Sequence, residues 1–567
     1  MQKTTDFIQE FLIAKGIKCQ FGYPGGVICH YLDSARKYQN EIDTVLNYHE
    51  QASAFSACGY AHAVQIPGVC FATSGPGTTN LLTGVANAFY DSIPMIVFTG
   101  QVDTYSLRQD ERQRQRGFQE VDTVSLFKPI TKYAVQIKNV NDMRYELEKA
   151  FWLATNGRKG PVLLDLPADV QRAYADFDHM QKYTSDGLLS SSASQLISAL
   201  EQAKRPLIVA GAGVRQSGMA ALFRELVEKW RIPVVTSMPA LDLLEYAHPL
   251  YGGFIGTNGH RYANMLVAKS DVILTLGSRL DLKQVGSERN KFAPQAKIYR
   301  VDIDESELAQ KVQDSETDIK ADIETLLPEL LHHTPKMDYR DGNWLAVVRL
   351  VKKKLQYCND TEKAHRYVRE ISRLAPEETS YVLDVGQHQV WTAQALEIKR
   401  NQRVYMSAGL GSMGYALPAA IGVYYATRKP VCVFVGDGGL QMNIQELNLI
   451  ARENMPISVF VFNNKSLGMI RQFQEKNFNS YFFKTTQNTG YHPLSLHKLA
   501  DAYGMKYDAV KDTKELSPLA SRVQEPAIIE LDLPSNTYLT PNYAKGQPLY
   551  NQMPELNSAD IEELLAL

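Results

Sequence analysis

The sequence predicts an α/β protein made of three domains, each with a doubly wound parallel sheet. The chain has 567 residues, far more than one hydrophobic core usually spans. Short β-branched or apolar runs, such as Val272–Leu276 and Ile457–Phe462, alternate with longer helical stretches and Gly-rich turns. This alternation is typical of parallel sheets whose strands are joined by crossover helices.

The order of these runs predicts the domain organisation. Three α/β units are expected at residues 1–175, 195–331 and 361–533. Polar or charged segments at 176–194 and 332–360 are predicted to be linkers. The tail, 534–567, has several prolines and tyrosines but no strand pattern, so we expect it either to wrap over the surface or to close a site.

Composition excludes some classes of partner. The 60 basic and 62 acidic residues nearly cancel, so no global field gathers nucleic acid or an anionic membrane. The chain begins without a basic-then-apolar leader and has no run of about 18 uncharged apolar residues, which predicts a cytoplasmic protein. Its six cysteines form no CxxC pairs, which favours reduced core thiols over disulfides or a zinc site.

In the third unit, a carboxylate stands among glycines after an apolar strand. The strand Val431–Val435 is followed by Gly436, Asp437, Gly438 and Gly439. Asp437 could cap a helix, bind a nucleotide ribose, or bind a metal ion that is itself tied to a phosphate. Alone, an Asp-Gly pair after a strand most often indicates only a turn.

A second polar cluster ends the next predicted strand. Asn464 and Ser466 follow Ile457–Phe462 after one helix-compatible segment. Neighbouring parallel strands end at the same edge of a sheet, so Asp437 and Asn464 are expected to lie close together. Carboxylate and amide oxygens suit Mg²⁺, and glycines allow close backbone approach of an anion.

This pair of motifs resembles the thiamine diphosphate signature, in which Mg²⁺ bridges the protein and the diphosphate. The resemblance implies that Asp437, Asn464 and the backbone oxygen of Ser466 are metal ligands. It also requires a carboxylate that protonates the aminopyrimidine ring. Glu50, at the start of a helix rich in small residues, is the candidate, although a Glu near a helix N-terminus is by itself ordinary dipole matching.

Further motifs resemble one family over nearly the whole chain. The stretch from Phe71 through Asn80 to Val102, with Phe21–Gly26, Val385–Gln389 and Gly409–Tyr415, is similar to the acetohydroxyacid synthase (acetolactate synthase) family. In that family, the pyrimidine-binding domain of one subunit faces the diphosphate-binding domain of another. The resemblance therefore implies a homodimer or homotetramer that acts on small molecules. The balanced charge and the lack of long apolar runs predict no nucleic-acid or membrane partner.

The resemblance also assigns roles to individual residues. Glu50 is expected on the pyrimidine nitrogen, with Gly26, Phe118 and Gln119 near the reacting carbon. The remaining thiamine diphosphate contacts that it implies are Gln387, His388, Gly411, Met413, Gly436, Gly438, Gly439, Asn464 and Met469.

The middle unit is predicted to hold FAD. The segment Gly211-Ala212-Gly213 contains only part of the dinucleotide fingerprint. By itself it indicates no more than a tight turn. The resemblance nevertheless places a flavin here, and in synthases of this family the flavin takes no net part in the reaction. The implied FAD contacts are Gly211, Gly213, Ser237, Met238, Gly277, Arg279, Asp302 and Asp322.

This sequence differs from the family at three acceptor-side features. Phe473 stands where the family has tryptophan, and Lys283 where an arginine binds the acceptor. Ala168 replaces the lysine of the family's Pro-Lys-Asp. Lysine lacks the planar fork that grips a carboxylate with two parallel hydrogen bonds, so binding of a second 2-oxo acid at Lys283 and Phe473 stays open.

An unusually long, arginine-rich segment, 107–116, lies between the family motifs. It could be a solvated excursion of mixed charge, or its arginines could meet a phosphorylated or nucleotide-bearing acceptor. Together with the tail segment 546–554, it resembles a branch associated with surface-polysaccharide genes. That branch includes the yersiniose-pathway carboligase, which adds a two-carbon unit from pyruvate to a keto-deoxysugar nucleotide.

The sequence thus predicts a carboligase that uses thiamine diphosphate and Mg²⁺ to transfer a two-carbon unit from pyruvate to a ketone. Acetolactate synthesis from two 2-oxo acids, pyruvate decarboxylation and flavin-dependent oxidation are the alternatives within enzymes. A non-catalytic cofactor-binding subunit is the alternative from another class. The intact set Glu50, Asp437 and Asn464 argues against that last interpretation.

Overall fold

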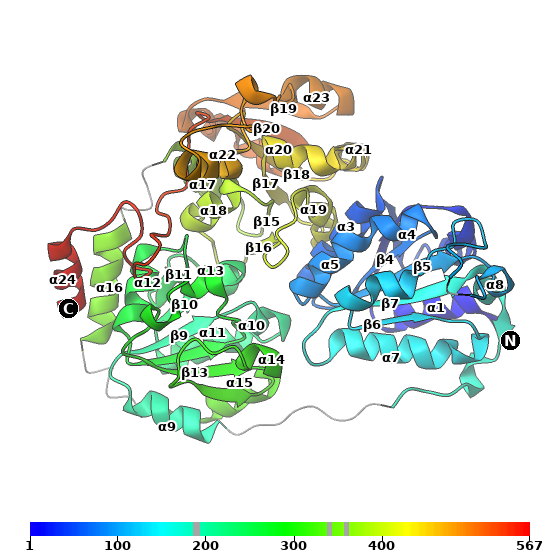
Figure 1. Cartoon of the computed structure of the whole chain (residues 1–567), viewed down its shortest axis with the longest axis horizontal. Coiled ribbons are helices and arrows are strands. Elements are labelled where there is room, and N and C mark those ends of the chain that lie inside the picture. The colour runs from blue at the N-terminus through cyan, green and yellow to red at the C-terminus, as the bar shows by residue number, and fades with distance from the viewer. Residues whose placement is uncertain (111, 185–192, 337–342, 357–361) are drawn as a thin grey trace.

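Three six-stranded parallel sheets form the protein in the computed structural model (Figure 1). The structure describes residues 1–567 except 111, 185–192, 337–342 and 357–361. The predicted α/β class is confirmed. Of the six cysteines, Cys358 lies outside the described residues, and the other five are free thiols. Within the described residues, none of the helices combines the length and the hydropathy that a membrane crossing needs.

The N-terminal sheet has the strand order β3-β2-β4-β5-β7-β6. Its strands are β2 (Cys19–Gly22), β3 (Asp43–Leu46), β4 (Gly68–Ala72), β5 (Met95–Gln101), β6 (Tyr133–Gln136) and β7 (Pro161–Pro167). Its helices are α1 (Thr4–Ala14), α2 (Cys29–Lys37), α3 (Glu50–Val64), α4 (Pro76–Asn80), α5 (Leu82–Tyr90), α6 (Thr123–Phe127), α7 (Met143–Thr155) and α8 (Ala168–Arg172). A short antiparallel pair, β1 (Gln2–Lys3) with β8 (Tyr174–Ala175), joins the two ends of this domain.

The central sheet has the order β11-β10-β9-β12-β13-β14, the doubly wound order common in dinucleotide-binding domains. Its strands are β9 (Pro206–Ala210), β10 (Val234–Thr236), β11 (Tyr251–Phe254), β12 (Val272–Leu276), β13 (Lys297–Asp302) and β14 (Thr317–Lys320). Its helices are α9 (Ser194–Gln202), α10 (Gly213–Gln216), α11 (Ala220–Trp230), α12 (Arg261–Lys269), α13 (Leu282–Val285), α14 (Glu305–Leu308), α15 (Ile323–His332) and α16 (Trp344–Leu355).

The C-terminal sheet has the order β16-β15-β17-β18-β20-β19. Its strands are β15 (Ser380–Leu383), β16 (Arg403–Met406), β17 (Val431–Gly436), β18 (Ile457–Asn463), β19 (Lys506–Val510) and β20 (Ala527–Asp532). Its helices are α17 (Lys363–Leu374), α18 (Gln387–Ala395), α19 (Ala416–Thr427), α20 (Asp437–Leu440), α21 (Leu447–Arg452), α22 (Gly468–Asn477) and α23 (Leu496–Tyr503).

Helices α3 and α19 join the N-terminal and C-terminal domains. A Cβ on Gly59 of α3 would overlap the carbonyl oxygen of Ala419, and a Cβ on Gly422 of α19 would overlap that of Ser56. The backbones therefore touch because glycine stands at both crossing points. Side chains from both helices share one hydrophobic core with the two sheets.

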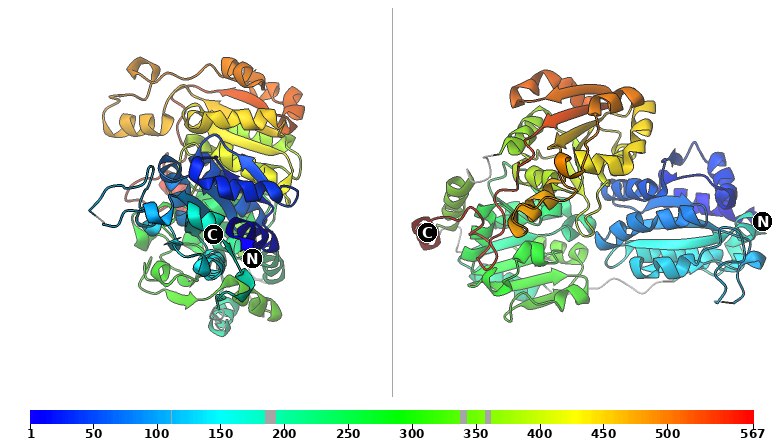
Figure 2. Two further views of the ribbon diagram at one scale, coloured as in Figure 1. Left: turned by 90° about the vertical axis from the view of Figure 1, so that its right-hand side faces the viewer. Right: turned by 45° about the horizontal axis from the view of Figure 1, so that its top comes forward.

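Two segments beyond the expected sheets complete the central domain. Helix α16 falls within the segment predicted as a linker, yet Trp344, Val348 and Val351 are buried in the core of the central domain. The tail adds helix α24 (Ser558–Ala566) and buries Leu549 and Leu564 in the same core. In Figures 1 and 2 the red tail runs along the green central domain. The tail thus acts as part of that domain.

Candidate active site at the edge of the C-terminal sheet

Asp437 and Asn464 follow the paired ends of two neighbouring strands. In the register of β17 with β18, Gly436 lies opposite Phe462, so both side chains follow the same edge of the sheet. Asp437 is 3 % exposed and Asn464 is 5 % exposed. Burial raises the pKa of Asp437 to about 6, while the phenol of Tyr491 opposes the rise by donating a 2.8 Å hydrogen bond to Oδ2.

The segment after β18 turns back on itself. The amide nitrogen of Ser466 donates to Asn464 Oδ1 at 3.2 Å, and that of Gly468 donates to the carbonyl oxygen of Ser466 at 2.9 Å. Among the described residues, no cluster of three His, Cys, Asp or Glu side chains forms a metal site. A cation held at this edge would therefore depend on one carboxylate together with amide, backbone and phosphate oxygens, which is a donor set that suits Mg²⁺.

Beside Asp437, the start of α18 presents a buried polar atom without a partner. The His388 ring is 5 % exposed, and within the described residues its Nε2 has no hydrogen-bond partner. Burial lowers the pKa of His388 to about 3, so the ring is neutral. A Cβ on Gly436 would stand 3.1 Å from His388 Nδ1. An unsatisfied buried nitrogen is costly. In the tautomer that carries the ring proton on Nε2, this nitrogen would donate to an oxygen of a diphosphate.

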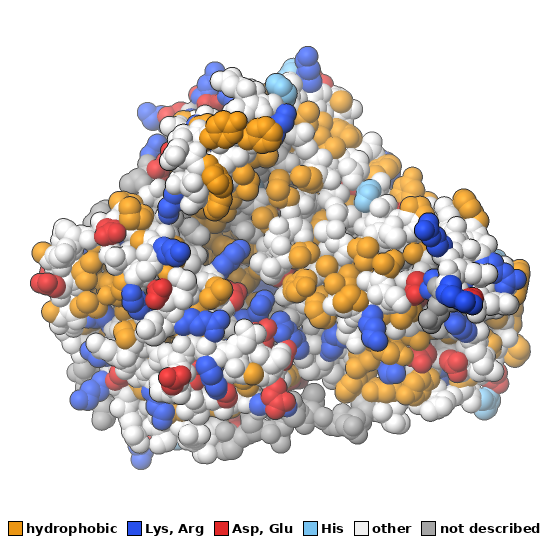
Figure 3. Space-filling view, in the orientation of Figure 1, with side chains coloured by type: hydrophobic (Ala, Val, Ile, Leu, Met, Phe, Trp, Pro, Cys, Tyr) orange, Lys and Arg blue, Asp and Glu red, His pale blue; other side chains and the backbone are white. Residues whose placement is uncertain are grey.

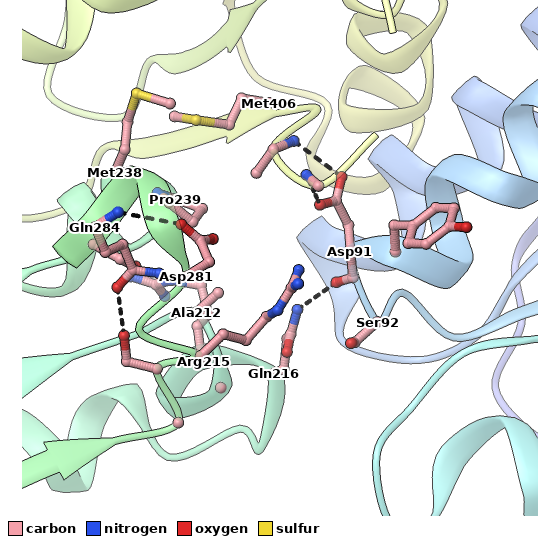
Figure 4. A pocket seen from close by; sticks show the side chains of 18 of the residues that line it. Asp91, Ser92, Ala212, Arg215, Gln216, Met238, Pro239, Asp281, Gln284 and Met406 are labelled. Atoms are coloured by element: carbon pink, nitrogen blue, oxygen red, sulfur yellow. Dashed lines mark hydrogen bonds between the residues drawn. The ribbon is translucent and has the colours of Figure 1, made fainter. Parts of the chain in front are cut away.

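The loop that carries Gly411 and Met413 is held from the N-terminal domain. Asp91 accepts hydrogen bonds from the amide nitrogens of Gly409 at 2.6 Å and Ala408 at 3.1 Å, as Figure 4 shows. Burial raises the pKa of Asp91 to about 6. Gly411 has φ +71°, a left-handed conformation that favours glycine, and Met413 is 37 % exposed.

The Glu50 carboxylate lies at the first turn of α3. It accepts a 2.9 Å hydrogen bond from Asn80 Nδ2 and is 9 % exposed. Gln119 adopts φ +64° and packs against Gly75, where a Cβ would stand 2.9 Å from Gln119 Cβ. Gly26 begins the short helix Gly26–Ile28, and Phe118 is 84 % exposed.

Glu50 and the loop at 407–414, which carries Gly411 and Met413, are not directly hydrogen-bonded among the described residues. The nearest link runs through Asn443, whose Nδ2 donates to Gln51 Oε1 at 3.1 Å and to the carbonyl oxygen of Gly414 at 2.8 Å. Glu50 begins α3 in the N-terminal domain and Asp437 begins α20 in the C-terminal domain.

A cavity of about 450 Å³ lies where the three domains meet (Figure 4). Arg403 of β16 reaches Asp242 of the central domain at 2.9 Å and the carbonyl oxygen of His62 at 3.2 Å. Gln216 donates to the carbonyl oxygen of Asp91 at 2.6 Å. The residues expected to contact a flavin that line the cavity are Gly213, Ser237, Met238, Gly277, Arg279, Asp302 and Asp322.

Gly211 is not among the residues that line the cavity. A Cβ on Gly211 would overlap the carbonyl oxygen of Gly277. Its role is to let β9 and β12 approach. The cavity's arginines are paired with carboxylates: Arg279 with Glu307 at 3.1 Å, and Arg158 with Glu307 at 2.8 Å. An anionic ligand would have to displace or bridge these pairs.

The acceptor-side departures occupy two different places. Lys283, on α13, lines the same cavity. Phe473, on α22, is 57 % exposed, with its ring 5.9 Å from that of Phe478. Hydrophobic side chains gather over α22 on the face seen in Figure 3, and Met469 is 43 % exposed there.

Sequence analysis assigned no site role to three residues that contact these sites. Tyr491 bonds Asp437, and Glu446 bonds Asn47 of the N-terminal domain at 2.9 Å. Gln552 of the tail donates to the carbonyl oxygens of Thr257 and Gly259 at 3.0 and 3.1 Å. Each contact joins residues at least 54 positions apart, so no local pattern reports it.

Comparison with known proteins covers most of the chain. Three family models match, described as the thiamine pyrophosphate enzyme N-terminal TPP binding domain (residues 2–126), central domain (193–330) and C-terminal TPP binding domain (384–531). The acetolactate synthase large subunit of Lactococcus lactis is 36 % identical over 94 % of this chain and 92 % of its own. The acetolactate synthase isozyme 1 large subunit of Escherichia coli K12 is 33 % identical over 95 % and 96 %.

Proposed function

Since the chain belongs to the thiamine pyrophosphate enzyme family and is an acetolactate synthase-like carboligase that uses pyruvate, we propose that it transfers the two-carbon unit of pyruvate to a ketone acceptor. One observation supports this most. Asp437 is a buried carboxylate at the edge of the C-terminal sheet, and His388 at the start of α18 has a buried Nε2 without a partner among the described residues; this combination suits a bound metal-diphosphate group.

Thiamine diphosphate, when bound, supplies the electron sink that lets CO₂ leave pyruvate. In our proposal, Asp437, Asn464 and the backbone oxygen of Ser466 hold Mg²⁺. Glu50 keeps a proton on the pyrimidine ring. The diphosphate is bound by Gln387, His388 and the amides of Gly438 and Gly439, with Gly436 and Met469 beside it, Gly411 and Met413 on the pyrimidine, and Gly26, Phe118 and Gln119 near the reacting carbon.

We also propose that two copies of the chain complete each site, as a homodimer or homotetramer. The lack of a hydrogen bond between Glu50 and the 407–414 loop among the described residues supports this. So does the exposure of Phe118, Met413 and Met469, which a neighbouring copy would cover. Closure by that copy excludes water, which would otherwise protonate the reacting carbon and end in acetaldehyde.

FAD is proposed for the cavity at the domain junction. Its volume of about 450 Å³ lies in the range of cofactor sites, roughly 300–1,000 Å³. Arg158 and Arg279 stand beside it to meet phosphate, and Asp302 and Asp322 stand at the end proposed for the ribose and adenine. The cavity extends to Gly386 and Met469, so the two cofactor sites adjoin.

The acceptor that we propose is a keto-deoxysugar nucleotide. In the arginine-rich loop, Arg108 pairs with Asp122 and Arg112 pairs with Asp110. Among the described residues, neither Arg114 nor Arg116 has a carboxylate partner. Glu120 holds the loop by accepting the amide hydrogens of Arg108, Arg116 and Gly117. Arg116 donates one 3.4 Å hydrogen bond to the carbonyl oxygen of Leu107. Two guanidinium groups on a braced loop, without a carboxylate partner among the described residues, suit a nucleotide diphosphate.

Acetolactate formation from two 2-oxo acids is the second candidate, because the relatives named above are acetolactate synthases. Product analysis separates the two: protein, thiamine diphosphate, Mg²⁺ and pyruvate are incubated alone, with 2-oxobutyrate, or with a keto-deoxysugar nucleotide. We expect a branched sugar product with the nucleotide. Acetolactate alone would select the second candidate, and acetaldehyde alone would indicate a decarboxylase.

A loop variant sharpens this test. Replacing Arg114 and Arg116 by Ala should raise the KM for the sugar nucleotide about 10-fold, as expected for loss of about 1.4 kcal/mol of binding. Arg112→Ala is the matched control, because Arg112 is already paired with Asp110. If the double variant and Arg112→Ala change the KM for the sugar nucleotide equally, Arg114 and Arg116 do not bind the acceptor.

A further inference from the structure

The expected cation ligands lie on two separate segments. Asp437 begins α20, and Asn464 and Ser466 lie in the connection from β18 to α22. A third segment, residues 485–491, contacts both. It lies between α22 and α23 and belongs to neither strand end.

The first contact is with the carboxylate. The hydroxyl of Tyr491 donates to Asp437 Oδ2 at 2.8 Å and would stand 3.4 Å from a Cβ on Gly438. The phenol thus binds one carboxylate oxygen, Oδ2. The pairing fixes the rotation of the carboxylate about its last bond.

The second contact is with the segment after β18. The carbonyl oxygen of Thr485 accepts from Ser466 Oγ at 2.8 Å and from the amide of Leu467 at 3.0 Å. An isolated antiparallel bridge also pairs Ser466 with Thr486. These bonds hold the peptide that carries the carbonyl oxygen of Ser466.

Internal bonds make the 485–491 segment a rigid unit. Thr486 and Thr489 form a reciprocal capping box, and the amide of Tyr491 donates to the carbonyl oxygen of Thr486 at 3.0 Å. Thr485 Oγ1 donates to Gln474 Oε1 of α22 at 2.7 Å. The segment can therefore couple the position of Asp437 to that of Ser466.

We propose that residues 485–491 form an outer clamp of the cation site and that Tyr491 is the positioning residue that orients the Asp437 carboxylate toward a divalent cation. The proposal rests on the proposed function, which places Mg²⁺ between Asp437 and Asn464. Partners of this kind fix the orientation of a ligand, and their loss typically lowers metal affinity about 10–100-fold.

Tyr491→Phe tests the proposal, because it keeps the ring and removes the hydroxyl. Mn²⁺ binding is measured by electron paramagnetic resonance, and the Mg²⁺ needed for half-maximal thiamine diphosphate binding by tryptophan fluorescence. We expect both cations to bind about 10–100-fold more weakly. Saturating Mg²⁺ should restore coenzyme binding. Tyr481→Phe is the control, because Tyr481 is 74 % exposed.

A second variant guards against a folding defect. Ser466→Ala keeps the backbone oxygen but removes the bond to Thr485, so it should weaken cation binding in the same direction. Thermal unfolding without cation or coenzyme should match wild type for both variants. Unchanged cation affinity in Tyr491→Phe would overturn the clamp. Failure of the wild-type protein to bind any divalent cation with thiamine diphosphate would overturn the proposed function itself.

Discussion

The N-terminal and C-terminal domains share one topology and use it differently. Numbered by chain order within each domain, both sheets run 2-1-3-4-6-5, whereas the central sheet runs 3-2-1-4-5-6. Helices α3 and α19 each follow the second strand of their sheet, and they pack against each other. The two outer domains therefore meet through equivalent helices, as two copies of one scaffold would.

The difference lies in which strand end bears the carboxylate. In the N-terminal domain Glu50 follows the second strand, while Thr73 to Gly77 follow the third. In the C-terminal domain Asp437 follows the third strand, and the helix after the second begins at Ala416 with no acidic side chain. In our proposal, one scaffold carries a proton-holding group in one copy and a cation ligand in the other, because chemistry depends on a few residues at strand ends rather than on the fold.

Removing the charge at Glu50 should have the largest effect on carboligation. Glu50→Gln keeps an acceptor for Asn80 but cannot hold a proton on the pyrimidine ring. We expect carboligation to fall about 10²–10⁴-fold, the usual contribution of a positioned acid or base, while thiamine diphosphate stays bound. Product formation and coenzyme binding are measured together, with the exposed Glu41→Gln as control. Full turnover in Glu50→Gln would refute the assigned role.

Sequence reasoning predicted the parallel strands β17 and β18, which pair in the structure. Asp437 and Asn464 follow these neighbouring strands, so their place at one edge of the sheet could be expected from the order of apolar runs. Helix α16 was missed although Trp344, Val348, Val351 and Leu355 repeat at helical spacing, because its polar surroundings suggested a linker. That signal was available. The bonds of Tyr491 and Gln552 depend on how distant segments pack, and no local pattern encodes them.

Adding a methyl group at one of the two helix-crossing points should weaken the packing between the N-terminal and C-terminal domains rather than alter the active-site chemistry. A glycine in a helix usually costs about 1 kcal/mol relative to alanine, so Gly422→Ala would stabilise an isolated helix. Here the added Cβ overlaps the carbonyl oxygen of Ser56, and we expect a net loss of about 3 kcal/mol, the upper part of the range for overpacking. Urea unfolding measures it.

Gly59→Ala, at the other crossing point, supplies the matched comparison. Its Cβ would overlap the carbonyl oxygen of Ala419, so it should destabilise the same interface. Once one substitution has parted the helices, the second should cost less, and the double variant should fall short of the sum. Strict additivity, or a gain in stability from Gly422→Ala, would show that the helices are not held by this close approach.

Glu446 links the same two domains through a buried carboxylate. Its side chain is fully buried and accepts hydrogen bonds from Asn47 Nδ2 and the amide of Tyr48, both at 2.9 Å. Burial raises the pKa of Glu446 to about 7, although these two bonds oppose the rise. The folded protein therefore keeps a proton that the unfolded chain releases near the ordinary glutamate value of 4.5.

This shift gives the interface a pH dependence of known sign. Because the folded pKa is the higher one, the proton stabilises the fold at low pH, and that contribution is lost as pH rises from 4.5 to about 7, amounting to about 3 kcal/mol. Glu446→Gln has no proton to lose. Its free energy of unfolding, relative to wild type in urea, should therefore improve by up to about 3 kcal/mol between pH 4.5 and 7.5. The same difference for exposed Glu453→Gln should stay flat, and a flat difference for Glu446→Gln would mean that this carboxylate ionises as it does in water.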